Sequence, residues 1–209
     1  MRRLLIVGAG GHGKVVLEMA QAMGGYDAIC FIDDQLVGEK VLGHQVVGKI
    51  ADCKELQQSF QEAIVAIGDN ALRLELTKKL LVMGYKMPPI IHPKAIISRS
   101  AQIGEGTVVM PLAVVNAEVT INQAVIVNTG VIVEHDCRVE AGVHLSPRSS
   151  LGGTVYIGEK SWIGMGASVI HTIHIGSNVI VGAGAVVIRN IKDGVKVVGV
   201  PAKEIVDKG

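Results

Sequence analysis

Residues 121–145 read INQAVIVNTGVIVEHDCRVEAGVHL, and in this stretch an aliphatic side chain returns at every sixth position. The same step runs without an insertion from Ile97 to Val187, and all sixteen positions hold Ile, Val or Leu. A strict period over so long a segment indicates a repeat architecture in which each unit stacks on the next. We interpret each six-residue unit as one short strand and one turn, so that three units complete a triangular coil and the repeated residue points inward.

The composition fits a thin core made of small aliphatic layers. Hydrophobic residues make up 49% of the 209 residues but aromatic residues only 3%, and 26 residues are glycine. An aromatic ring would overfill the narrow interior of such a coil, whereas glycine suits tight corners. The uninterrupted repeat predicts about five coils.

Residues 1–87 follow a different pattern, in which short strands alternate with helices. The predicted strands are 4–7, 28–32 and 63–67, and the predicted helices are 14–23 and 71–83. This alternation is typical of a parallel sheet with crossover helices. Pro88, Pro89 and Pro93 then mark a boundary. We expect a Rossmann-like half domain at 1–87 and a β-helix with a C-terminal tail at 88–209.

Charge and cysteine content exclude several classes of protein. The net charge of +1 gives no broad basic surface for nucleic acid. Cys30, Cys53 and Cys137 are an odd number without metal-like spacing, which favours a reduced, cytoplasmic protein. The start MRRLLIVGAGGHGK is too short in its apolar run for a signal peptide. No apolar run approaches the ~18 residues of a membrane span.

The loop Gly8-Ala9-Gly10-Gly11-His12-Gly13 fits G-x-G-x-x-G between a predicted strand and a predicted helix. With Asp33 and Asp34 further along, this pattern is typical of dinucleotide binding. Three hypotheses follow: an NAD(P) site, a tight turn without a ligand, or a site for the diphosphate of a nucleotide sugar. The predicted domain is about half of a doubly wound dinucleotide domain, which argues against a complete NAD site.

His135 and Asp136 are the candidates for acid–base chemistry. His135 lies two residues after the inward Val133, so its side chain should lie near a corner or on the outer face of the coil. Imidazole exchanges protons near neutral pH, and a neighbouring carboxylate can orient it. Glu134 is given only a supporting role. Cys137 occupies a position where the repeat usually has Val or Ala, which favours packing over a covalent acyl-enzyme.

A metal site is a rival hypothesis, because trimeric hexapeptide proteins also include zinc-dependent carbonic anhydrases. The candidate ligands are His135, His144, His171 and His174. Their spacing does not repeat at eighteen residues, the step that would stack them on one face of the coil, so no metal is expected. His144 follows His135 by one and a half faces of a coil. The two histidines therefore cannot be close neighbours within one coil, and we expect them to meet across subunits of a homotrimer.

Three motifs together resemble one family. They are GAGGHG at 8–13, NTGVIVEHDC at 128–137 and GVPAK at 199–203. The chain resembles, over its whole length, the UDP-4-amino-sugar N-acetyltransferases of the bacillosamine-pathway type and their sialic acid O-acetyltransferase relatives. The resemblance implies a left-handed parallel β-helix. It also implies an acetyl-CoA-dependent transfer to the 4-amino group of a UDP-linked amino-deoxy sugar.

The resemblance also implies roles for individual residues. His135 would be the general base and Asp136 would tune it. The positions implied for the nucleotide sugar are Gly10, Gly11, His12, Asp33, Asp34 and Gly68. The positions implied for acetyl-CoA are His144, Gly153, Met165, Ala183 and Lys203. The family often has Ser where this chain has Gly10, so one hydroxyl contact would be missing.

Other functions stay open at this point. An O-acetyltransferase acting on sialic acid or a related sugar would use the same base. A sugar-nucleotide-binding trimer without catalysis would use the β-helix only as a stalk. An NAD-dependent enzyme is the last alternative. Binding of acetyl-CoA with thiol release separates the enzyme from the stalk, and nicotinamide binding tests the last alternative.

Overall fold

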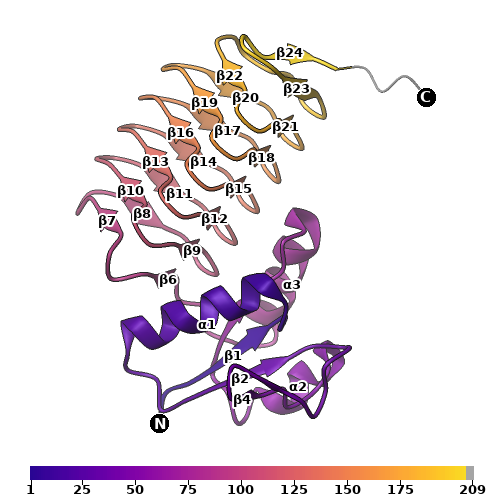
Figure 1. The fold of residues 1–209 in the computed structure, drawn as a ribbon. Helices are drawn as coiled ribbons and strands as arrows, with labels where there is room; N and C mark the ends of the chain where they lie inside the picture. The colour runs from indigo at the N-terminus through magenta and orange to yellow at the C-terminus, as the bar shows by residue number, and fades with distance from the viewer. Residues whose placement is uncertain (206–209) are drawn as a thin grey trace.

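The computed structural model describes residues 1–205 and consists of an N-terminal α/β part followed by a long β-helix (Figure 1). The N-terminal part lies at one end of the β-helix, and the chain leaves at the opposite end. The predicted architecture, a parallel α/β sheet followed by a parallel coil of hexapeptide repeats, is therefore confirmed.

The N-terminal part is a three-stranded parallel sheet in the order β2–β1–β5. Successive residues of β1 point to opposite faces of the sheet, so Leu4 and Ile6 pack against α1 while Leu5 and Val7 pack on the side of α3. All five predicted elements are present. Their bounds are β1 Arg3–Val7, α1 Gly11–Met23, β2 Ala28–Ile32, β5 Glu62–Val65 and α3 Asn70–Val82.

The sequence patterns missed four short elements between β2 and β5. These are β3 Lys40–Val41, β4 His44–Gln45, the 3₁₀ turn η1 Ile50–Asp52 and α2 Cys53–Leu56. Elements of two to four residues are too short to produce a periodic pattern. None of the helices in residues 1–205 is long and apolar enough to cross a membrane.

The glycines of the loop before α1 have two different roles. Gly8 has a φ of +102°, and a Cβ on Gly13 would overlap the carbonyl oxygen of Gly8. These two glycines are needed for the close approach of strand and helix. Gly10 and Gly11 have nothing within 4 Å of a Cβ position. The middle of the loop therefore leaves its backbone open to a ligand.

The β-helix has three faces, and on each a strand pairs in parallel with the strand one coil further on, apart from the last strand of face C, β24. Face A contains β7 Ile96–Ile97, β10 Val114–Val115, β13 Ile132–Val133, β16 Ser150–Leu151, β19 Ser168–Val169 and β22 Val186–Val187. Face B contains β8 Gln102–Ile103, β11 Thr120–Ile121, β14 Arg138–Val139, β17 Tyr156–Ile157 and β20 His174–Ile175. Face C contains β6 Ile90–Ile91, β9 Val108–Val109, β12 Ile126–Val127, β15 His144–Leu145, β18 Trp162–Ile163, β21 Ile180–Val181, β23 Lys196–Val198 and β24 Lys203–Glu204. The sixteen repeat positions supply six strands of face A and five each of faces B and C, and β6 and β23 extend face C beyond them. The β-helix therefore has about six turns, and the expectation of about five was slightly low.

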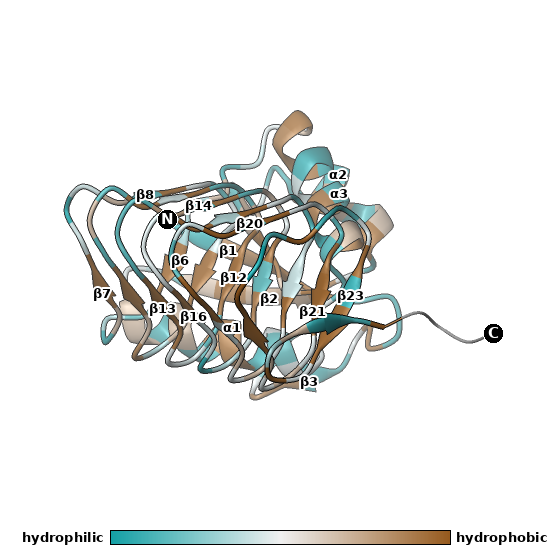
Figure 2. Cartoon of the chain, turned by 90° about the horizontal axis from the view of Figure 1, so that it is seen from above, coloured by the Kyte–Doolittle hydropathy of each residue, from teal (hydrophilic) through white to brown (hydrophobic). Residues whose placement is uncertain are grey.

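The inward position predicted from the six-residue period is the second residue of each short strand. Val115, Val133 and Leu151 are successive partners on face A and are at most 1% exposed. Figure 2 shows the strands of the β-helix mainly in the colours of hydrophobic residues. In the described chain this core cluster contains no aromatic side chain, as the composition predicted.

The turns repeat as strictly as the strands. Every sixth residue from Gly106 to Gly184 has a φ between +55° and +69°. Most of these positions hold residues with a Cβ, for which the left-handed conformation is unfavourable, so the coil imposes it. Asp136 is one of them, with a φ of +58°. His135 therefore lies in the turn between β13 and β14, at the corner between faces A and B.

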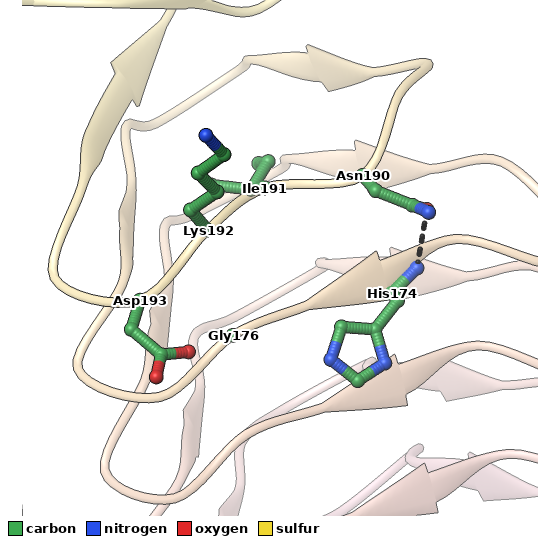
Figure 3. A pocket seen from close by; sticks show the side chains of 6 residues that line it. All are labelled: His174, Gly176, Asn190, Ile191, Lys192 and Asp193. Carbon is green, nitrogen blue, oxygen red and sulfur yellow. Dashed lines mark hydrogen bonds between the residues drawn. The ribbon is translucent and has the colours of Figure 1, made fainter.

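The last coil is closed by side chains and by the C-terminal tail. On face B the amide of His174 donates to Asn190 Oδ1 (2.8 Å; Figure 3), and the amide of Ser177 donates to Asp193 Oδ1 (2.9 Å). On face C, β24 pairs with β23 in the antiparallel direction. On face A the carbonyl of Gly199 accepts from the first residue of β22. Backbone donors that would otherwise be unpaired at this edge are thus satisfied.

Replacing Gly13 by alanine tests the packing role of the loop glycines. Gly→Ala inside a helix normally stabilises by about 0.5–1 kcal/mol. Gly13→Ala should instead lower the free energy of unfolding by roughly 1–3 kcal/mol, because its Cβ would overlap Gly8. Gly10→Ala is the matched control and should change stability little. Chemical denaturation of both variants measures the difference, and equal stabilities would contradict this account.

Candidate active site

His135 and Asp136 form an exposed pair at the corner between faces A and B. Nδ1 of His135 lies 2.7 Å from Oδ2 of Asp136, and the two side chains are 61% and 55% exposed. Because a carboxylate only accepts, Nδ1 of the ring is the donor, and Nε2 lies on the opposite side of the ring from Asp136. Gly153 lies one coil further on, and a Cβ there would come 2.7 Å from the His135 ring. The imidazole therefore rests over bare backbone and can accept a proton from outside.

His171 lies at the same corner as His135, which corrects the spacing argument used against a metal. The strands β13, β16 and β19 that precede His135, Gly153 and His171 are successive partners on face A. The two imidazoles are thus two coils apart, about 10 Å at ~4.8 Å per strand, too far for one ion to bind both. No group of three or more potential metal ligands gathers within residues 1–205.

Cys137 is part of the core rather than of a reactive site. The side chain is 1% exposed and packs in the β-helix interior, and its thiol donates to the carbonyl of Gly152 at 3.1 Å. Burial raises the pKa of this thiol to about 11. Because the thiolate is the nucleophile, a buried thiol with a raised pKa is a poor candidate for acyl transfer.

Three residues implied for acetyl-CoA line one apolar groove on face C: His144, Met165 and Ala183. The groove has a volume of about 430 Å³, and its other walls are Ser146, Pro147, Trp162, Gly164, Ile180, Val181 and Gly182. The ring of His144 stacks on that of Trp162, with centroids 5.6 Å apart and planes 5° apart. Trp162 Nε1 donates to Ser146 Oγ at 2.7 Å. An apolar groove with a few fixed polar groups is typical of a small-molecule site.

The N-terminal part covers face C only up to this groove. The core beneath α1 includes Ile90, Val108 and Ile126 from the first strands of face C, whereas Trp162 and Ile180 on the same face are exposed. Ile126 pairs with His144 of the next strand on face C, so His144 continues the row of Val108 and Ile126. The groove therefore begins where the cover ends.

His12 and His144 lie at this junction together with Arg73. Burial lowers the pKa of His144 to about 4, and the positive charges of Arg73 and His12 act in the same direction. Burial also lowers the pKa of His12 to about 4, again with Arg73 adding to it. Both imidazoles are neutral at neutral pH. Among the described residues no group bonds to the buried Nε2 of His12, so this atom is free for a ligand.

The remaining positions implied for the nucleotide sugar surround the Gly-rich loop. Asp33 Oδ2 accepts from the amide of Ala9 at 3.0 Å, and Asp34 Oδ1 accepts from the amide of Ile50 at 2.9 Å. These carboxylates thus hold the conformation of the loops around them. Gly68 lines a depression of about 320 Å³ whose other walls include Asn70, Lys160, Trp162 and Ile180. Trp162 and Ile180 separate this depression from the face C groove.

One chain does not bring all the predicted residues together. His135 lies at the corner between faces A and B, whereas His144 lies on face C on the other side of the coil. Lys203 lies on β24 and lines a different depression. The predicted residues therefore lie in separate places on the chain.

Two residues that line or adjoin the groove, Arg73 and Trp162, were not predicted from the sequence. In the sequence, Arg73 is one of several charged residues between the apolar positions of α3, and nothing in the pattern distinguishes it. Trp162 is the single tryptophan of the chain and occupies an outward position of the repeat. A lone large ring in a protein with 3% aromatic residues was a usable signal for a binding surface.

Comparisons with known proteins agree along the whole chain. Residues 3–80 match the family model of the PglD N-terminal domain, residues 116–147 match the hexapeptide repeat of succinyl-transferase, and residues 154–189 match the bacterial transferase hexapeptide. The acetyltransferase domain of PglB from Neisseria gonorrhoeae, solved with acetyl coenzyme A, is 45% identical with a TM-score of 0.95. That match covers 98% of this chain and 99% of the other.

Two further relatives carry substrate names. Perosamine N-acetyltransferase from Caulobacter crescentus, solved as a histidine-to-asparagine variant with CoA and GDP-perosamine, is 41% identical with a TM-score of 0.95. The match covers 99% of this chain and 98% of that one. The UDP-N-acetylbacillosamine N-acetyltransferase of Bacillus subtilis is 40% identical over 112 residues, 53% of this chain and 52% of that protein.

The low pKa values of His12 and His144 predict a stability that depends on pH. Unfolded histidines titrate near ~6.5, whereas these two remain neutral down to about 4 in the folded chain. Between these values the unfolded chain binds more protons. Their contribution to stability is therefore complete above ~6.5 and is lost as the pH falls toward 4. Thermal unfolding between pH 4 and 7 measures this loss.

Two variants separate this effect from that of the carboxylates. His144→Asn should flatten the fall of the melting temperature across this window, because one of the two buried imidazoles is gone. His171→Asn changes an exposed histidine and should leave the slope as it is. Identical slopes in the two variants would show that His144 does not contribute.

Proposed function

This chain belongs to the PglD-type family of hexapeptide-repeat sugar N-acetyltransferases, and from that premise we propose that its acceptor is the 4-amino group of a UDP-linked amino-deoxy sugar. As a member of this family it is an acetyl-CoA-dependent enzyme acting on nucleotide-linked amino sugars. The observation that carries the proposal is the junction at His12. There an open Gly-rich loop, a neutral buried imidazole and the apolar groove of His144 lie next to one another.

The nucleotide distinguishes two candidate substrates. The relative from Bacillus subtilis, named for a UDP-linked sugar, supports UDP. The structure from Caulobacter crescentus contains GDP-perosamine and supports GDP as the second candidate. Both names give nitrogen as the acceptor atom, which favours an amine over the hydroxyl of sialic acid.

His135 is proposed as the general base. Asp136 fixes the ring with the proton on Nδ1, so that Nε2 can take a proton from the sugar amine as its nitrogen attacks the thioester carbonyl carbon. A C–N bond forms, the C–S bond breaks, and CoA leaves as a thiol after receiving a proton. A base of this kind contributes roughly 10²–10⁴ to the rate, and holding amine and thioester together contributes the larger part.

The groove on face C is proposed as the site of acetyl-CoA. Its walls at His144, Met165 and Ala183 are mainly apolar, which suits the thioester end of the donor. A backbone amide or the neutral imidazole of His144 can donate to the oxygen that becomes negative during attack. Gly153 serves His135 by leaving room for its ring. Lys203 is retained as a candidate partner for a CoA phosphate.

We also propose that the active unit is a homotrimer with sites between subunits. The separation of His135 and His144 on one chain supports this, because a second chain can place its His135 over the groove. Exposed apolar side chains on two faces, such as Ile96 and Ile132 on face A and Ile180 on face C, suit a contact between subunits.

A substrate panel tests the reaction. Acetyl-CoA is incubated with UDP-linked and GDP-linked 4-amino sugars, and the released thiol is measured. The expected result is rapid release with a UDP-linked amine and slow release with its 4-hydroxy analogue, because the site is proposed to bind and deprotonate an amine. Faster release with GDP-perosamine would favour the second candidate, and no release with any nucleotide amino sugar would reject the function.

Mixing two inactive variants tests the shared site. His135→Ala and His144→Ala should each lower kcat by roughly 10²-fold or more. In trimers formed by co-expression, about a quarter of the interfaces join an intact His135 to an intact His144 of the neighbour, so about a quarter of wild-type activity should return.

If His135 and His144 of one site came from the same chain, the outcome would differ. Neither variant would then carry a complete site, and the mixed trimers would stay as inactive as the two parent variants. A fully active monomer of about 22.0 kDa in solution would likewise contradict the shared site. Trimers of His135→Ala alone, purified in the same way, provide the baseline.

A further inference from the structure

Arg73 on α3 is 1% exposed, yet it carries a guanidinium that bonds to three separate segments. Its bonds go to Ile67 O (3.1 Å) and Gly68 O (3.2 Å) after β5, to Asn70 Oδ1 (2.8 Å), and to Ala124 O (2.9 Å), Gly142 O (2.8 Å) and Val143 O (3.4 Å) of the β-helix. No carboxylate forms an ion pair with it within residues 1–205. Backbone carbonyls therefore solvate this charge.

Burying the charge of Arg73 without an ion-pair partner lowers the stability of the folded chain. A buried charge without an ionised partner loses its hydration, and burial lowers the pKa of Arg73 to about 10. Carbonyl dipoles offset part of that loss. The planar guanidinium has five donors in a fixed fork, whereas a lysine has one flexible ammonium. Only arginine can reach carbonyls on both sides of the junction at once.

The two sides that Arg73 joins are the two sides of the proposed site. Gly68 borders the depression on the nucleotide-sugar side, and Val143 directly precedes His144, which lines the acetyl-CoA groove. These segments belong to different parts of the chain and touch no common backbone ladder. Arg73 thus joins the acceptor side directly to the donor side. Asn70, which Arg73 contacts, adds hydrogen bonds to the carbonyls of Lys160 (3.1 Å) and Ser161 (3.3 Å).

The same charge faces both imidazoles of the junction. The positive charge of Arg73 acts on both His12 and His144, and His12 also acts on His144. The negative charge of Asp69 acts on Arg73 itself. Arg73 therefore disfavours protonation of the two histidines beside it. A neutral His144 can accept a hydrogen bond from acetyl-CoA through one ring nitrogen or donate one to it from its ring N–H.

We propose that Arg73 is a positioning residue for acetyl transfer: its guanidinium holds the turn at Gly68 and the strand that begins at His144 in fixed register, so that amine and thioester meet. This proposal rests on the proposed function, which assigns one side of the site to the nucleotide sugar and the other to acetyl-CoA. Arg73 touches neither substrate in this account. It acts through the backbone of the residues that do.

The experiment compares Arg73→Lys and Arg73→Gln with Leu74→Ala in the full-length protein. Leu74 is the matched control, because it is buried in the same junction with Ala124 and Ala141 but bonds to neither side of the site. Leu74→Ala should lower the melting temperature as a cavity does. Rates are measured by thiol release below the lowest melting temperature. Binding of CoA alone and of the nucleotide sugar alone is followed by the fluorescence of Trp162.

The expected result is a loss of kcat without a matching loss of binding. Misplacing reactants by about 1 Å can cost roughly 10²-fold in rate, so both Arg73 variants should lose on that order in kcat. Each ligand measured alone should keep its affinity within about threefold, since each side stays intact. Arg73→Lys, which keeps the charge but loses the fork, should lose nearly as much as Arg73→Gln. Leu74→Ala should keep kcat within about threefold.

Other outcomes overturn the proposal. Arg73 variants that keep wild-type kcat show that the fork is not needed for register. A parallel loss of kcat in Leu74→Ala, or failure of both Arg73 variants to fold while Leu74→Ala folds, shows that Arg73 only stabilises the junction. Absence of thiol release in the wild-type protein with every nucleotide amino sugar rejects the proposed function instead, which keeps the two failures distinct.

Discussion

The inward aliphatic side chain at every sixth residue is the constraint on which the rest of this molecule depends. It sets the width of the coil, and that width excludes aromatic rings from the core. It also fixes the turns, because each corner forces one residue into the left-handed conformation whether or not it is glycine. What remains free is the outward and corner positions. The chemistry of the chain is confined to those positions, and His135, His144 and Trp162 all occupy them.

A rigid coil presents its side chains accurately but cannot form a deep pocket by itself. The N-terminal part supplies the missing wall by packing α1 on the first strands of face C and stopping short of His144. The junction is held by apolar contacts and by the carbonyl ligands of Arg73, which a change on either side would disturb. Groups on rigid elements are held more accurately than groups on loops, which suits a reaction whose rate depends on placing two substrates together.

The sequence predicted those features that repeat or that depend on local geometry. The ladder through Val133 and the corner position of His135 followed from counting, and the strand–helix alternation followed from periodicity. Arg73 could not be found in this way, because its role depends on carbonyls far from it in the chain, such as those of Ala124 and Gly142. The short hairpin β3–β4 carries too few residues for a pattern. The different roles of Gly8 and Gly10 needed coordinates, because a motif does not show which glycine has room for a Cβ.

The closure of the last coil has a consequence for solubility at high concentration. Parallel β-helices expose at their ends the same row of donors and acceptors that joins one coil to the next, and an open end is a template for another molecule. In this chain Asn190 and Asp193 occupy that row on face B with side-chain oxygens, and an antiparallel strand ends face C. Asp193 also brings a negative charge to the end of the stack. Growth of the protein into end-to-end fibres is thereby opposed at the only end of the coil that the N-terminal part does not cover.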